Sequence, residues 1–195
     1  AERDGKNIQV PTLDDVVAVF SEFYFGGDPS GDFNKWKGFI KNEPLLVDKD
    51  FFEELSNQKI LWGFISGAEP PSARYLLEKR IGLKAPPLIA MGDAPEKPNP
   101  KGLIRLAERL LNSSLNKGNV PIAYLGDTVA DVITVLNARE AKPNQIFFSL
   151  AVSPPHLHAK KHKGARENYE KTLLNAGADE ILRTTQAAIE YIKDW

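Results

Sequence analysis

The chain of 195 residues contains no cysteine. This absence excludes disulfide scaffolds, thiolate zinc sites, iron–sulfur clusters and cysteine nucleophiles, and it favours a cytoplasmic location. An excess of either charge is also absent: 25 Lys and Arg stand against 26 Asp and Glu, so no overall positive field attracts nucleic acid or an anionic membrane. No apolar run approaches the roughly 18 residues of a membrane span, and the first residues lack a signal-peptide pattern.

Histidine is scarce as well, and the three that occur lie in one basic segment between residues 154 and 166. The spacing of His156, His158 and His162 could bind zinc. Pro154-Pro155 before it and the lack of a neighbouring Asp or Glu in the sequence favour a solvated basic loop instead. Such a loop could still recruit an anionic substrate.

Apolar residues make up 42% of the chain and charged residues 26%, which is ordinary for a globular protein of one domain or of a core with a small satellite. Apolar runs predict strands at 60–65, 87–91, 120–125, 146–152 and 180–182. Helical periodicity predicts helices at 12–25, 48–58, 72–81, 103–111, 128–141, 165–176 and 186–195. This alternation is typical of an α/β protein with a largely parallel sheet and helices on both of its faces.

The N-terminal part follows a different pattern. Residues 1–10 are polar and predict a tail, and Thr12 with Asp15 predicts a capped start for the helix at 12–25. Residues 26–44 carry aromatic side chains with weak periodicity, which predicts a loop with room for one helical turn. The chain begins with Ala and not Met, so we expect it to have been processed, trimmed or cut from something longer.

Because ligands of parallel α/β sheets bind at the carboxyl ends of the strands, the residues after each apolar run are the candidate site. Ser66 and Gly67 follow the first run and could offer a hydroxyl and a backbone amide to a phosphate oxygen. A plain strand-to-helix turn is the simpler interpretation of this pair alone. The nucleophile elbow is excluded because its glycines do not flank the serine at the required spacing.

Lys97 follows the second run in a loop with three prolines, which limit the conformations in which the lysine is presented. Its ammonium could neutralise a phosphoryl charge, although a surface lysine in a proline-rich connection is the alternative. Asp127 and Asp131 follow the third run and could supply oxygen ligands to Mg²⁺. Helix capping explains the same two carboxylates equally well.

Taken together, a hydroxyl, a lysine and an acidic pair after successive strands favour phosphoryl transfer. Adenine-nucleotide signatures are absent, since the chain has neither a P-loop sequence nor a Gly-x-Gly-x-x-Gly motif.

The segments FISGA at 64–68, EKPNP at 96–100 and YLGDTVAD at 124–131 resemble motifs two, three and four of the haloacid dehalogenase superfamily, in the same order. Longer stretches resemble a cyanobacterial branch of its phosphatase-like subfamily with a helical cap. The resemblance implies a Rossmann-like core at 45–195, part of the cap at 1–44, and Mg²⁺-dependent hydrolysis of a small phosphorylated metabolite through an aspartyl-phosphate. It also implies that Ser66 and Gly67 bind phosphate, that Lys97 stabilises it, and that Asp127 and Asp131 serve the metal.

One departure from the family pattern concerns the first motif, an apolar strand ending in Asp-x-Asp that supplies the nucleophile. In the family this motif precedes the cap, and the chain has no such segment there; Arg3-Asp4-Gly5 is a poor substitute. In the family's sheet the missing strand lies between those at 60–65 and 120–125, and its removal would leave two unpaired edges. We therefore expect a separate N-terminal segment to carry it. The alternatives are a non-catalytic relative that binds a phosphorylated ligand or a protein partner, and, less favoured, a different doubly wound domain.

Overall fold

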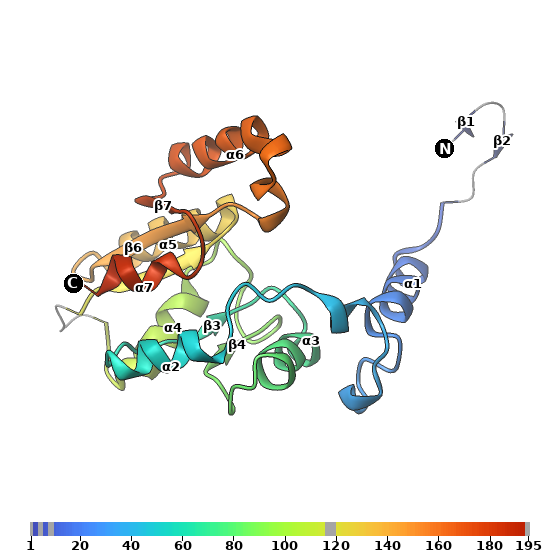
Figure 1. The fold of residues 1–195 in the computed structure, drawn as a ribbon, viewed down its shortest axis with the longest axis horizontal. Helices are drawn as coiled ribbons and strands as arrows, with labels where there is room; N and C mark the ends of the chain where they lie inside the picture. The colour runs from blue at the N-terminus through green and yellow to red at the C-terminus, as the bar shows by residue number, and fades with distance from the viewer. Residues whose placement is uncertain (1, 4–5, 8–9, 116–119, 194–195) are drawn as a thin grey trace.

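The computed structural model describes residues 2–3, 6–7, 10–115 and 120–193 (Figure 1). Its helices are α1 Leu13–Phe25, α2 Lys49–Asn57, α3 Pro70–Arg74, α4 Lys101–Leu111, α5 Val129–Ala141, α6 Lys163–Asn175 and α7 Ala187–Ile192. Its strands are β1 Glu2–Arg3, β2 Lys6–Asn7, β3 Phe64–Ile65, β4 Leu88–Ile89, β5 Ile122–Gly126, β6 Phe147–Val152 and β7 Glu180–Leu182. None of the described helices is long and apolar enough to cross a lipid bilayer.

Parallel strands form the core, which confirms the predicted α/β class. Strands β5, β6 and β7 pair in that order, and β3 pairs with β4. Side chains of β6 alternate between two layers of helices: Ala151 packs in the cluster with α5 and α6, and Leu150 packs with α7. Helices therefore cover both faces of the sheet, because each strand is apolar on both sides.

The sheet is in two pieces. The predicted strands at 60–65 and 87–91 are wrong in length, because only Phe64 with Leu88 and Ile65 with Ile89 are in register. Among the described residues, no strand pairs with the other edge of β3 or of β5. Both pieces nevertheless contact one apolar cluster, in which Ile65 of β3 and Ile122 of β5 pack against α4 and α5.

Two predicted elements differ in detail from the structure, and part of a third cannot be compared with it. The helix at 72–81 begins earlier, at Pro70, and continues from residue 75 to 80 as a π-helical turn. The tail at 1–10 contains the short antiparallel strands β1 and β2 among its described residues. The predicted end of the last helix at Trp195 lies outside the described residues.

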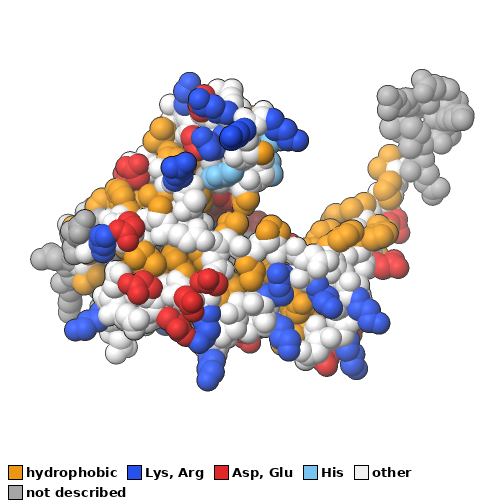
Figure 2. Space-filling view, viewed as in Figure 1, with side chains coloured by type: hydrophobic (Ala, Val, Ile, Leu, Met, Phe, Trp, Pro, Cys, Tyr) orange, Lys and Arg blue, Asp and Glu red, His pale blue; other side chains and the backbone are white. Residues whose placement is uncertain are grey.

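The N-terminal region extends away from the sheets (Figure 1). Helix α1 has the predicted capping box, and the loop after it makes two short 3-10 turns, where one helical turn was expected. A buried cluster joins this region to the rest of the chain, consisting of Phe25, Trp36, Ile40 and Tyr75. Most apolar side chains of α1 are exposed to solvent (Figure 2). Phe20 and Phe23, for example, are 56% and 60% exposed.

Candidate active site

The turn between β5 and α5 holds the most constrained side chain of the site, Asp131. Thr128 accepts a hydrogen bond from the Asp131 backbone N–H at 3.2 Å, and its own N–H and hydroxyl donate to Asp131 Oδ2 at 3.0 and 2.7 Å. Gly126 makes this close approach possible, since a Cβ there would lie 2.4 Å from the Asp131 Cβ. The turn therefore folds the carboxylate back over the tip of β5, where Asp131 is only 3% exposed.

Lys97 reaches Asp131 from the proline-rich loop after β4. Its Nζ donates to Asp131 Oδ1 at 2.6 Å, and the hydroxyl of Tyr124 donates to the same oxygen at 3.1 Å. Burial by itself would raise the pKa of Asp131, but the hydrogen bonds from Lys97 and Thr128 outweigh it and hold that pKa below its ordinary value. Asp131 is therefore a buried anion whose charge Lys97 balances.

Asp127 lies at the tip of β5 with its side chain reachable from solvent. Its backbone N–H donates to Asp131 Oδ2 at 3.2 Å, and its carbonyl accepts a hydrogen bond from the Tyr169 hydroxyl of α6 at 2.7 Å. Partial burial, and then the negative charge of Asp131, raise the pKa of the Asp127 carboxyl. The backbone is thus held from two sides, and the carboxylate is free to meet a ligand.

Ser66 and Lys97 line one hollow of about 350 Å³, at the carboxyl ends of β3 and β4. Gly67 and Thr128 border the same hollow. The Ser66 hydroxyl accepts a hydrogen bond from the backbone N–H of Ala68 at 3.0 Å, so its own proton can point to a ligand. A phosphate-sized anion in this hollow would meet a hydroxyl and an ammonium together.

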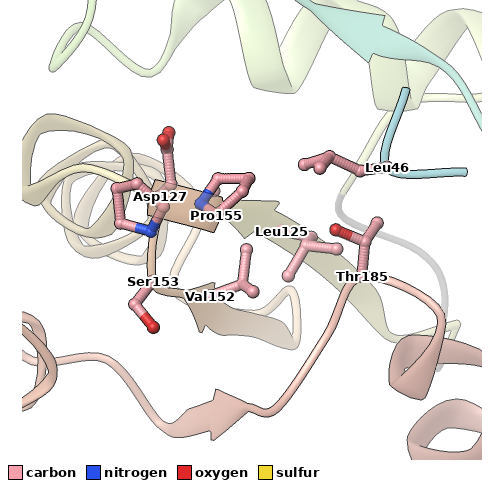
Figure 3. A pocket seen from close by; sticks show the side chains of 9 residues that line it. Leu46, Leu125, Asp127, Val152, Ser153, Pro155 and Thr185 are labelled. Carbon is pink, nitrogen blue, oxygen red and sulfur yellow. The ribbon is translucent and has the colours of Figure 1, made fainter. Parts of the chain in front are cut away.

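Asp127 lines a second, neighbouring hollow of about 260 Å³ (Figure 3). The β5–α5 turn separates the two hollows: Gly126 and Asp127 border the second, and Thr128 borders the first. The structure therefore brings Ser66, Gly67 and Lys97 to one hollow, links Lys97 directly to Asp131, and leaves Asp127 on the adjoining side of the turn.

The described residues do not by themselves fit a magnesium site. Asp131 already accepts hydrogen bonds from Lys97, Tyr124, Thr128 and the Asp127 N–H, so its oxygens are engaged. Only the Asp127 carboxylate remains available, and no three His, Asp or Glu side chains gather as a metal site within residues 10–115 and 120–193. Magnesium takes near-octahedral oxygen ligation, so further ligands would have to come from elsewhere.

Three residues of this site are not among the predicted ones: Tyr124, Thr128 and Tyr169. Thr128 was detectable in the sequence, because Thr-x-x-Asp before a helix is a capping pattern. Tyr124 and Tyr169 carry no such signal, since an inward-facing tyrosine in a strand or helix is ordinarily a core residue.

The histidine segment also has partners that are distant in sequence. His158 Nε2 lies 2.9 Å from the carbonyl oxygen of Ser153, and the Ser153 hydroxyl donates to Glu170 of α6 at 2.9 Å. The sequence has no Asp or Glu beside these histidines, but α6 folds back and brings Glu170 to Ser153, which also contacts His158. Lys and Arg side chains still gather over this part of the molecule (Figure 2).

No protein-family model matches the sequence, and no curated protein matches it. Its fold recurs in solved structures. A phosphonoacetaldehyde hydrolase like protein from Oleispira antarctica superposes with a TM-score of 0.65 over 95% of this chain, at 17% identity. This chain spans 66% of the length of that protein. A haloacid dehalogenase-like hydrolase from Bacteroides fragilis is 20% identical, with a TM-score of 0.48 over 72% of this chain and 57% of its own. At 17% identity, the likeness to the Oleispira antarctica protein shows a shared α/β fold.

Proposed function

We propose that this chain is the larger part of a phosphomonoester hydrolase of the haloacid dehalogenase type. The observation that carries the proposal is the hollow shared by Ser66 and Lys97 at the strand ends, with Lys97 held by the buried Asp131 at 2.6 Å. A phosphoryl group there would be bound by the Ser66 hydroxyl and by the Lys97 ammonium. Asp131 acts as a positioning residue, because it fixes Lys97 and does not face the ligand.

The proposal includes a segment, not among these residues, that supplies the nucleophilic aspartate. The two-piece sheet supports it: β3 and β5 each have an unpaired edge, and an apolar parallel strand between them would pair both. The sequence resemblance implies that the enzyme depends on Mg²⁺. The same segment would have to supply further ligands to that ion, because Asp127 offers only one. Residues 1–44 would be part of the cap and residues 45–195 the core, as the extended position of α1 suggests.

The test is hydrolysis of p-nitrophenyl phosphate by the full-length gene product, with and without added Mg²⁺. Lys97→Ala and Asp127→Asn should each lower kcat/KM by at least about a hundredfold, since each removes a charge from the site. Asp15→Asn is the matched control, because this aspartate caps α1 away from the strand ends, and it should leave the rate unchanged. Full activity in the Lys97 variant would refute the proposal.

A second candidate function is a non-catalytic protein that binds a phosphorylated ligand or a protein partner. It is favoured because no described strand ends in Asp-x-Asp: the Asp48-Lys49-Asp50 segment instead caps and begins α2. Intact-mass analysis, together with the sequence encoded before Ala1, separates the two functions. A full-length product without the aspartate pair that binds inorganic phosphate and shows no turnover would establish the second.

A further inference from the structure

The second hollow, beside Asp127, has no role in holding the phosphoryl group. Its volume is about 260 Å³, and it lies directly across the β5–α5 turn from the hollow lined by Ser66 and Lys97. A group attached to a phosphate in the first hollow would therefore reach the second by passing the Asp127 side chain.

Apolar side chains form most of its wall. Leu125 and Val152 come from the ends of β5 and β6, Pro155 from the loop after β6, and Leu46 from the segment before α2 (Figure 3). The hydroxyl of Thr185 points towards this space, and it makes no hydrogen bond to another described residue (Figure 3). The hollow thus offers an apolar surface with one polar group.

Contacts outside the hollow hold these walls in place. The Ser153 hydroxyl points away from the hollow (Figure 3) and donates to Glu170 at 2.9 Å, while His158 binds the Ser153 carbonyl at 2.9 Å. On the opposite side, Gln186 donates to the carbonyl of Leu46. Because the walls are anchored from α6, from the histidine segment and from the turn before α7, the hollow is formed before any ligand arrives.

We propose that this hollow binds the organic part of the substrate, and that this part is a compact, largely apolar group such as an aryl or short alkyl chain with one hydrogen-bonding atom. The inference rests on the proposed function and names its substrate class. A dry cavity of about 150 Å³ is known to accept benzene, so a single ring with a small substituent fits the available space. A polyhydroxylated sugar does not suit it, because several hydroxyls would lose water and find only Thr185 as a partner.

The experiment measures binding of inorganic phosphate, phenyl phosphate and glucose 6-phosphate to the full-length protein by calorimetry without Mg²⁺, so that neither ester is hydrolysed. Phenyl phosphate should bind at least about tenfold more tightly than inorganic phosphate, because the ring leaves water for an apolar wall. Glucose 6-phosphate should bind no more tightly than inorganic phosphate. Equal affinities for phenyl phosphate and inorganic phosphate, or a preference for the sugar phosphate, would overturn the inference.

A pair of variants locates the effect. Leu46→Trp fills the hollow from an exposed segment and should weaken phenyl phosphate binding about tenfold without changing inorganic phosphate binding. Leu45→Trp is the matched control, since Leu45 is similarly exposed and does not line the hollow, and it should change neither. If Leu46→Trp and Leu45→Trp behave alike, the ring binds elsewhere and the inference fails. If Lys97→Ala leaves inorganic phosphate binding unchanged, the proposed function itself fails.

Discussion

Helices α1 and α5 begin with the same capping box, but only in α5 do residues distant in sequence also bind its aspartate. The Thr hydroxyl donates to Oδ2 of the Asp at 2.7 Å in both, and the Asp N–H donates to the Thr hydroxyl at 3.2 Å in both. Asp15 is exposed, and among the described residues only Thr12 hydrogen-bonds to its carboxylate. Asp131 is buried, and Lys97 and Tyr124 bind its second oxygen. One motif therefore caps a helix in α1 and fixes a cation in α5.

The largest expected difference between the two boxes is in stability. Asp131→Ala should lower the free energy of unfolding by about 3 kcal/mol, because it leaves the Lys97 ammonium half-buried without its partner. Asp15→Ala should have a much smaller effect, since water replaces the lost contacts. Urea unfolding of both variants measures the difference. Equal losses would mean that Asp131 is only a helix cap.

Gly126 sharpens the comparison, because its backbone lies close against the Asp131 side chain of the α5 box. Gly126→Ala would place a Cβ 2.4 Å from the Asp131 side chain, so the carboxylate must move, and we expect a loss of about 2 kcal/mol in stability and of phosphate binding. Gly67→Ala is the control for stability, since its added Cβ would meet nothing within 4 Å. A stable Gly126→Ala protein that still binds phosphate would show that the position of Asp131 is not required.

The ion pair between Lys97 and Asp131 makes the stability of the protein depend on pH. The pKa of Asp131 is held below its ordinary value, so its contribution is present above that ordinary value and is lost as the pH falls through the lowered pKa. Lys97→Met should destabilise the protein by about 2 kcal/mol at about pH 7, and this loss should shrink as the pH falls through the lowered pKa of Asp131 and that carboxyl takes up a proton. Urea unfolding over a series of pH values from neutral to acid checks this. A loss independent of pH would assign the effect to packing of the lysine stem.

Tyr124 contributes the other hydrogen bond on Asp131 Oδ1. Tyr124→Phe keeps the packing of the ring against α4 and α5 and removes only the hydroxyl, so the loss should be about 1 kcal/mol. Chemical denaturation measures it, with Tyr169→Phe as the comparison on the Asp127 side. A larger loss of stability in Tyr124→Phe than in Lys97→Met would mean that Tyr124, and not Lys97, contributes more to holding Asp131.

The smallest effect is expected at Asp127, and it has the opposite sign. The pKa of this carboxyl is raised, so its ionisation disfavours the folded state as the pH rises through its ordinary value. Asp127→Asn should therefore leave the protein equally stable or slightly more stable at neutral pH, while it removes activity. Thermal unfolding and p-nitrophenyl phosphate hydrolysis measure the two consequences. A clear destabilisation would indicate a structural role for the carboxylate.

Sequence patterns succeeded where the interactions are local. The helix starts at Thr12 and Thr128 follow from residues three positions apart, and the strands at 146–152 and 180–182 follow from short apolar runs. They failed for β3 and β4, because the length of a strand depends on its partner: Leu61 belongs to the apolar run but is 57% exposed. The proximity of Glu170 to the histidine segment was likewise invisible, since α6 brings it there.

The sequence by itself determined that the chain is an α/β protein and that a hydroxyl, a lysine and two carboxylates follow its strands, because periodicity and chain order are local properties. Only the tertiary structure decided what those groups do. In the folded chain the Asp131 carboxylate binds Lys97, and Asp127 stays accessible beside an apolar hollow. The described sheet is divided between β3 and β5. These outcomes depend on which distant residues compete for the same oxygen or strand edge, and that competition is settled only when the chain packs.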